Sequence, residues 1–538
     1  MEKIMSIRMF NFFVLPFFVF LLFNLNGCSS NKVQQDVPKA VNLKSSSFYI
    51  NQAKSLSGKK KNSTLLLASQ AAIKEQNFKI ASDALSQIDE SNLSQNDKIV
   101  YYNQLSKVNF QNKNYIKSAN NLASANSFID DTSQKKKNWN KVLEILHYAD
   151  IFSLTNSHNN VYQSDLSPWI NLALIQKEYA DNFEVLQTKI NQWKVDNPSL
   201  LNVIPENINT ISNYNDGGAQ NILLYLPLSG KYSRQGQDIL SGFKYKQSTS
   251  LNNTYQINTI DSNKIPVSQL PSIIQNQNID VLVGPLQKDN VSKLVKSNSV
   301  SIPTILLNTS KEPKNNTSLC TFTLSPEKQA AQVAQKMFKE NKFRPIVIVP
   351  DTNFGYRSAQ AFKNSWLKVS NFSPIVLKIK GNNQIQSKLK ALFKGKTNTP
   401  DSVFFIGNKS QLLLTKAYIE LYLPAGINQP QIYSNSSTNI LNSSQSELKD
   451  LQNVKFIDLS ILMPGAKPSD YPVNNINDLR VSALGFDSFS LISAIQEMKL
   501  NPYIQINGAT GKLSLGNDCN IETQYSWGQV RSGQIIKQ

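Results

Sequence analysis

Five side chains in the sequence carry a thiol or an imidazole, the groups most often used for covalent and acid–base chemistry. They are the cysteines Cys28, Cys320 and Cys519 and the histidines His147 and His158. The sequence contains no HExxH and no CxxC motif, so the usual zinc-protease and dithiol signatures are missing. Both histidines fall in the first half of the chain, which leaves no imidazole for a Ser-His-Asp site in the second half. We therefore expect no catalytic residue, no metal site and no cofactor.

The remaining motif matches are weak. Two Ser-x-x-Lys matches, at 325–328 and 446–449, have no Lys-Thr-Gly partner and are expected by chance in a chain this rich in serine and lysine. The segment 508–512 reads Gly-Ala-Thr-Gly-Lys and is too short for a phosphate-binding loop, which needs four residues between its glycines. The sequence therefore disfavours a hydrolase or a nucleotide-dependent enzyme.

Cys28 follows a segment typical of a secretory signal. Lys3 and Arg8 precede an apolar stretch over 10–23, and Gly27 stands directly before the cysteine. The arrangement resembles a bacterial lipoprotein lipobox, in which the cysteine becomes the diacylated N-terminus, although Asn26 stands where a small residue is usual. A transmembrane anchor is the alternative, but the apolar stretch is shorter than the ~20 residues that a bilayer span needs. We predict a signal peptide over 1–27 and lipidation of Cys28.

Acylation at Cys28 predicts where the protein resides. More than one acyl chain gives stable membrane anchoring, and the polar residues 28–44 are expected to form a flexible tether. By resemblance to the sorting of Gram-negative lipoproteins, Ser29 in place of Asp favours the outer membrane, with the protein facing the periplasm.

The chain is strongly basic, with a formal net charge of +19. Lysine clusters at 59–61 and 135–137 indicate attraction to an acidic partner, such as peptidoglycan, lipid headgroups or an acidic protein. Compositional drift is the alternative, because the whole chain is rich in Lys, Asn, Ile and Ser. The expected location excludes nucleic acid.

Residues 45–197 are predicted to form helix after helix. Apolar residues recur at helical spacing, and short turns precede Phe78 and Tyr115, which occupy equivalent places in two copies of one pattern. Ala81 and Ser118 are small at the same later position of each copy. The layout resembles a tetratricopeptide repeat, with a generic helical bundle as the alternative.

After a Pro- and Gly-containing stretch, 198–219, which we expect to be a linker, the pattern changes to short buried strands alternating with helices. Such alternation predicts parallel sheets with helices on both faces. It occurs in two series within 220–538, so the sequence predicts two α/β lobes with a cleft at the carboxyl ends of their strands.

Several segments of this region, in order, resemble a known family. They are 226–243 (LPLSGKYSRQGQDILSGF), 283–291 (VGPLQKDNV), 322–327 (FTLSPE), 349–355 (VPDTNFG), 483–489 (ALGFDSF) and 508–515 (GATGKLSL). They resemble type I periplasmic-binding-protein domains and, more narrowly, the LppC/LpoA family of penicillin-binding protein activators. The resemblance implies a TPR-like helical N-terminal domain followed by a bilobed type I periplasmic-binding-protein-like domain. It also implies an outer-membrane lipoprotein that regulates peptidoglycan synthesis by binding a class A penicillin-binding protein, and is itself no enzyme.

The cleft supplies the main alternative function, a lipoprotein receptor for a small amino-acid-like solute. In type I binding folds the loop that here spans 229–236 helps to hold ligand, since it joins a strand end to a helix N-terminus. A turn that only caps the helix is the alternative. The candidate ligand-binding residues are Ser229, Tyr232, Ser233, Asn308, Thr309 and Asp351.

Cys320 and Cys519 form a candidate disulfide. By the same resemblance, Cys320 begins the strand that crosses between the lobes, and Cys519 lies in the segment that returns to that hinge. An even pair in an oxidising compartment favours a bridge, with two separate buried thiols as the alternative.

Overall fold

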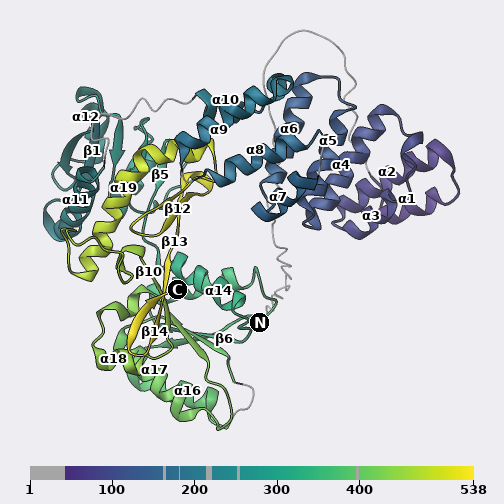
Figure 1. Ribbon diagram of the computed structural model, residues 1–538. Coiled ribbons are helices and arrows are strands. Elements are labelled where there is room, and N and C mark those ends of the chain that lie inside the picture. Colours follow the sequence, from purple (N-terminus) through teal and green to yellow (C-terminus); the bar gives the residue numbers. More distant parts are fainter. Residues whose placement is uncertain (1–42, 161–164, 181, 214–220, 251–254, 396–398) are drawn as a thin grey trace, which may run out of the picture.

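The computed structural model describes residues 43–160, 165–180, 182–213, 221–250, 255–395 and 399–538 (Figure 1). The predicted signal peptide, Cys28 and nearly all of the predicted tether lie outside these residues.

Residues 46–213 form an elongated array of helices, here called the helical arm, which projects from the two lobes (Figure 1). Its helices are α1 (Ser46–Ala53), α2 (Gly58–Lys74), α3 (Phe78–Leu85), α4 (Gln95–Gln111), α5 (Tyr115–Asn126), α6 (Thr132–Leu146), α7 (Ile151–Asn160), α8 (Ser167–Glu178), α9 (Phe183–Asp196) and α10 (Glu206–Asn213).

The two predicted helix-turn-helix copies are present as α2–α3 and α4–α5. The side chain of Asn77 accepts a hydrogen bond from the Ile80 amide and so begins α3 at the predicted turn. The small residue of each copy is buried: Ala81 is fully covered, and the Ser118 hydroxyl lies 2.9 Å from that of Ser106 on the preceding helix. Small side chains at these points let the paired helices pack closely.

The interval 198–219 is not simply a linker. Residues 198–203 form a 3-10 helix and 206–213 form α10. Ile204, Ile208 and Ile211 are fully buried against the arm because their spacing places them on one helical face. Pro198 begins the 3-10 helix and Pro205 stands directly before α10, so the helical arm extends to Asn213.

Lobe 1 contains a five-stranded, wholly parallel sheet in the order β2-β1-β3-β4-β5. Helices α11 and α19 pack on one face and α12 and α13 on the other. The strands are β1 (Asn221–Leu226), β2 (Gln256–Asp261), β3 (Val281–Val283), β4 (Thr304–Leu306) and β5 (Leu319–Thr321); the helices are α11 (Ser233–Ser248), α12 (Leu270–Asn276), α13 (Lys288–Ser297) and α19 (Ile476–Leu500).

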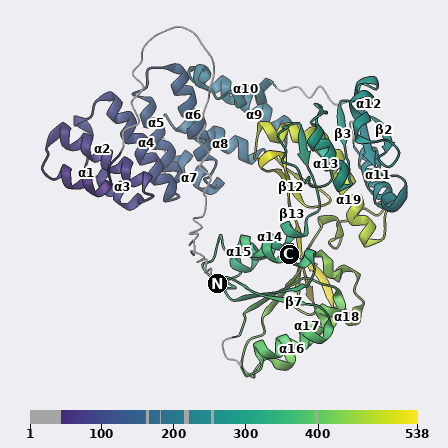
Figure 2. The ribbon, with the colours of Figure 1, turned by 180° about the vertical axis from the view of Figure 1, so that it is seen from behind.

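Lobe 2 contains a seven-stranded sheet in the order β15-β14-β10-β9-β8-β6-β7. Helices α14 and α15 cover one face and α16 to α18 lie on the other (Figures 1 and 2). Its strands are β6 (Pro345–Pro350), β7 (Ile375–Ile379), β8 (Ser402–Phe405), β9 (Gln431–Ser434), β10 (Lys455–Asp458), β14 (Ser526–Arg531) and β15 (Gln534–Lys537); its helices are α14 (Pro326–Lys339), α15 (Asn353–Trp366), α16 (Asn382–Phe393), α17 (Lys409–Tyr422) and α18 (Gln445–Asp450).

The expectation of parallel sheets fails at the C-terminal end of the chain. Strands β14 and β15 add to lobe 2 in antiparallel fashion. A separate antiparallel sheet consists of β11 (Gln505–Asn507), β12 (Lys512–Leu515) and β13 (Ile521–Gln524). These strands follow one another without intervening α-helices, and short connections of this kind favour antiparallel pairing.

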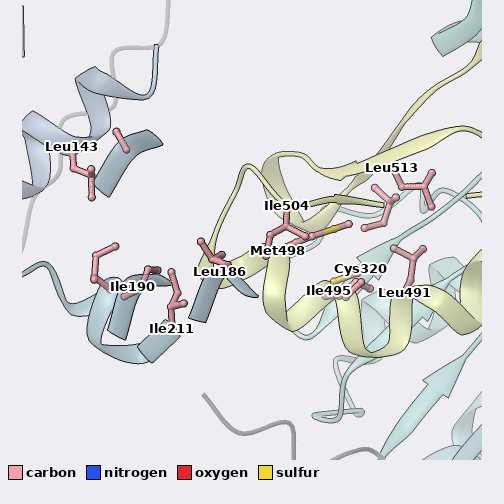
Figure 3. Packing of buried hydrophobic residues seen from close by; sticks show 14 of the residues in the cluster. Leu143, Leu186, Ile190, Ile211, Cys320, Leu491, Ile495, Met498, Ile504 and Leu513 are labelled. Atoms are coloured by element: carbon pink, nitrogen blue, oxygen red, sulfur yellow. The ribbon is translucent and has the colours of Figure 1, made fainter. Parts of the chain in front are cut away.

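Helix α19 joins all three parts of the molecule. Near its start, Arg480 forms an ion pair of 2.6 Å with the buried Asp458 of lobe 2. Its middle packs on α11 of lobe 1. Near its end, Met498 shares an apolar cluster with Leu186 and Ile211 of the helical arm (Figure 3). The arm and lobe 1 thus share one continuous core.

Candidate functional site

Lobe 1 places the predicted ligand loop at the carboxyl edge of its sheet. Ser229 follows β1, and its carbonyl oxygen accepts a hydrogen bond from the side chain of Asn263. The Ser229 hydroxyl, with the amides of Leu228 and Asn263, binds the Asp261 carboxylate and lowers its pKa, against the opposing effect of burial. The polar groups of Ser229 are therefore bonded within lobe 1.

The other predicted cleft residues are divided between the lobes. Tyr232 and Ser233 begin α11, and Asn308 and Thr309 follow β4, so both pairs lie at the same sheet edge as Ser229. The Asn308 side chain donates to the Leu286 carbonyl oxygen at 3.0 Å. Asp351 lies on lobe 2, 3.8 Å from the Lys380 ammonium. Within the described residues, no hydrogen bond or ion pair joins it to the lobe 1 set. A ligand-binding role for these residues stays a prediction.

A buried carboxylate helps to hold the joint between the lobes. Asp487 of α19 is fully buried and accepts hydrogen bonds from the amides of Ala509 and Thr510, at 2.6 and 2.8 Å, and from the Thr510 hydroxyl. Burial outweighs these bonds and raises the pKa of Asp487 to about 6. The carbonyl oxygen of Ala509 in turn accepts from the Ile461 amide at 2.8 Å. The turn before β12 is therefore attached to α19 on one side and to the segment leaving lobe 2 on the other.

A second connection at this joint is covalent. Cys320 of β5 is bonded to Cys519, with their Cα atoms 4.6 Å apart. Thr321 and Asn520, the residues that follow, form a parallel β-bridge. The Lys314 ammonium lies 3.3 Å from the Cys519 carbonyl oxygen, and its burial lowers its pKa to about 8. The disulfide and the β-bridge thus fix β5 to the segment around Cys519 and Asn520.

A groove of about 1290 Å³ lies on the helical arm, where the segment that follows α19 meets it. Residues of α4 and α6 line it, together with Pro502 and Tyr503, which follow α19. The ring of His147 lies 4.3 Å from that of Tyr503, and its Nε2 is 2.9 Å from the Gln176 side-chain oxygen. Burial lowers the pKa of His147 to about 4. The imidazole is therefore neutral at pH 7 and serves in the packing between arm and lobe.

The described residues hold no group of three or more His, Cys, Asp and Glu side chains arranged to bind a metal ion. None of the helices in the described ranges has the length and apolar character needed to cross a membrane.

The family model described as "LppC putative lipoprotein" matches residues 37–533, which include the helical arm and both lobes. The chain belongs to the LppC family. The match to a lipoprotein family indicates a protein of the bacterial cell envelope.

Two relatives illustrate the similarity within the LppC family. "Penicillin-binding protein activator LpoA" of Histophilus somni (strain 2336) is 28% identical over 487 residues, covering 88% of this chain and 80% of the relative. The protein of the same name from Aliivibrio fischeri (strain ATCC 700601 / ES114) is 24% identical and covers 95% of this chain and 96% of its own length.

Solved structures of LppC-family proteins share the fold. Full-length LpoA from Haemophilus influenzae is 22% identical, with a TM-score of 0.71, covering 92% of this chain and 98% of that one. The C-domain of LpoA from the same organism, described as "a regulator of PBP1A", matches with a TM-score of 0.52 at 24% identity, over 59% of this chain. The predicted order, a helical domain followed by two α/β lobes, is confirmed.

Sequence reasoning missed the residues that connect the parts. Asp487 and its partners Ala509 and Thr510 all lie in the segments 483–489 and 508–515 that suggested the family. No local signal pairs the two segments, because their contact arises only when α19 packs beside β12. The groove residues His147 and Tyr503 are likewise brought together only by the tertiary fold.

Proposed function

We propose that this protein binds a class A penicillin-binding protein through its two lobes and raises that enzyme's output of cross-linked peptidoglycan. The observation that carries the proposal is the match of the LppC family model across the arm and both lobes, together with relatives named as penicillin-binding protein activators. Catalysis then belongs to the synthase, and this protein shifts its population towards active states. The arm, continuous in its core with lobe 1, serves as a spacer.

The test adds the purified full-length chain in detergent to the cognate class A synthase and measures binding and cross-linked glycan product. We expect saturable binding and a higher rate of product formation. Binding without a rate change would reduce the role to a scaffold. Absence of binding would favour the solute-receptor alternative, which predicts a small molecule retained near Ser229 and detectable by native mass spectrometry.

We further propose that Cys28 is the acylated N-terminus and that residues 28–44 tether the arm to the outer membrane, with the protein facing the periplasm. The family match to a lipoprotein and the apolar stretch that ends at Gly27 and Cys28 support this proposal. Two or more acyl chains make the attachment stable.

Cys28→Ala is expected to leave the precursor unprocessed, because the thiol that receives the lipid is gone. The measurements are the mass of the protein and its distribution between membrane fractions, with Ser30→Ala as a control that keeps the thiol. Processing and outer-membrane fractionation of Cys28→Ala equal to the control would contradict the proposal.

A further inference from the structure

Lobe 2 exposes a cluster of large apolar side chains at the amino ends of its parallel strands. The cluster consists of Phe343, Leu367, Val369, Phe372 and Ile375, here called the lobe 2 apolar patch. The side chains of Phe343 and Phe372 are 50% and 73% exposed. Single exposed apolar residues are ordinary, but a contiguous group on a soluble domain marks an interaction surface.

The fold brings these residues together from three segments. Strands β6 and β7 are parallel and pair Ile346 with Ile375, so Phe343 and Phe372, each three residues earlier, approach the same sheet end. The Trp366 indole donates a hydrogen bond of 2.8 Å to the Phe372 carbonyl oxygen. The ring of Phe338 contacts both Trp366 and Phe343, at 6.1 and 5.8 Å between centroids.

Buried aromatic residues support the patch from beneath. Trp366 is fully buried, and its ring stacks on that of Phe362, which stacks in turn on Phe404 of β8. The exposed side chains therefore rest on a rigid base. A rigid apolar centre binds a partner with little loss of side-chain entropy.

The patch is rimmed by positive charge. Lys339, Lys342, Lys363 and Lys368 lie at the ends of α14 and α15 or directly after them, and none of these four forms an ion pair with another described residue. The carboxylate of Glu340 is engaged by Lys336 and Lys455. The carboxylate of Asp401 accepts hydrogen bonds from the backbone amides of Phe343 and Arg344. The acidic groups bordering the patch are thus turned to partners within lobe 2.

We propose that the lobe 2 apolar patch is the surface that docks the synthase, on a region of that enzyme with an apolar centre and an acidic rim. The inference rests on the proposed function and assigns it to particular residues. An apolar centre with aromatic residues and a charged rim is the usual anatomy of a protein interface. The lysine rim selects an acidic partner and speeds its encounter. A lipid surface is the competing occupant. The proposed anchor at Cys28, however, precedes α1 in the chain, and α1 lies at the far end of the arm from the lobes (Figure 1).

The test compares full-length variants for binding to the purified cognate synthase. Phe343→Ser/Phe372→Ser is expected to weaken binding roughly tenfold or more, because aromatic anchors dominate interface energies. Lys342→Glu/Lys368→Glu is expected to slow association and to weaken its salt dependence, since rim charges act mainly on encounter. Phe152→Ser on the arm, where the side chain is 75% exposed, and Leu421→Ser elsewhere on lobe 2 are matched controls expected to leave affinity unchanged.

Each outcome decides one question. Thermal unfolding must coincide for all variants, and the exposure of the substituted side chains makes this the expected result. If the wild-type chain binds and the patch variants bind equally well, the patch is not the docking surface, and the proposed function stands. If the wild-type chain does not bind, the proposed function itself fails. If instead the patch variants lose binding to vesicles containing phosphatidylglycerol while synthase binding is unchanged, the patch is a membrane surface and the docking proposal is overturned.

Discussion

Gly485→Ala is expected to destabilise lobe 1 by about 3 kcal/mol, the upper range for overpacking a close contact. Helices α11 and α19 cross at two glycines. A Cβ atom at Gly485 would lie 1.9 Å from the Ile239 carbonyl oxygen, and one at Gly242 would lie 1.9 Å from that of Ser482. Both obstacles are main-chain atoms, so no side-chain rotation relieves them. The two helices would have to separate, which would open the core between α11 and α19.

The sign of the effect makes the prediction sharp. In an unobstructed helix, alanine is more favourable than glycine by about 0.5–1 kcal/mol. Ser493→Ala, at a half-buried position of the same helix, is the matched control and is expected to leave stability nearly unchanged. Urea unfolding followed by circular dichroism measures both. A Gly485→Ala chain as stable as the control would show that the helices do not approach as closely as described.

Local patterns predicted the parts of this fold that local forces determine. The apolar faces of α2 and α4 repeat at helical spacing, and Asn77 caps α3 where a turn was expected. The run that forms β1 is buried on both faces and has the continuous apolar character of a parallel strand. The boundaries of these elements follow from the sequence because each depends on residues within a turn or two of the chain.

Contacts between distant segments could not be predicted in the same way. Gly242 and Gly485 look like ordinary helix glycines until α11 and α19 are brought together. The lobe 2 apolar patch is visible only once β6 and β7 are paired. In the sequence, Phe343 and Phe372 cannot be told apart from the aromatic residues of the core. The candidate cleft residues show the same limit, and their ligand-binding role stays a prediction. The sequence correctly placed Ser229 and Asn308 at strand ends, but it could not show that their polar groups bond within lobe 1.

The disulfide between Cys320 and Cys519 is another contact between distant segments. Of the contacts discussed, we expect it to contribute most to the free energy of unfolding. The bridge closes a loop with a sequence separation of 199 residues. For a loop of this length the chain-entropy model gives about 5 kcal/mol, and removal of a native disulfide typically costs about 2–5 kcal/mol. Cys320 is buried in β5, after which the chain leaves lobe 1, so the bridge restrains the joint between the lobes as well as the unfolded chain.

The test uses a chain carrying Cys28→Ser, in which Cys320 and Cys519 are the remaining cysteines. Alkylation under denaturing conditions without reductant is expected to add no label to the intact mass. Alkylation after reduction is expected to add two labels. Cys320→Ala/Cys519→Ala is expected to lose about 2–5 kcal/mol of unfolding free energy. Its stability should also be insensitive to reductant, whereas the parent chain should fall to about the same value once it is reduced. Alanine avoids placing a hydroxyl at the buried position of Cys320. Two labelled thiols in the untreated parent chain would refute the bridge. An unchanged unfolding free energy in the double variant would show that Asp487 and the Arg480–Asp458 ion pair hold the joint without it.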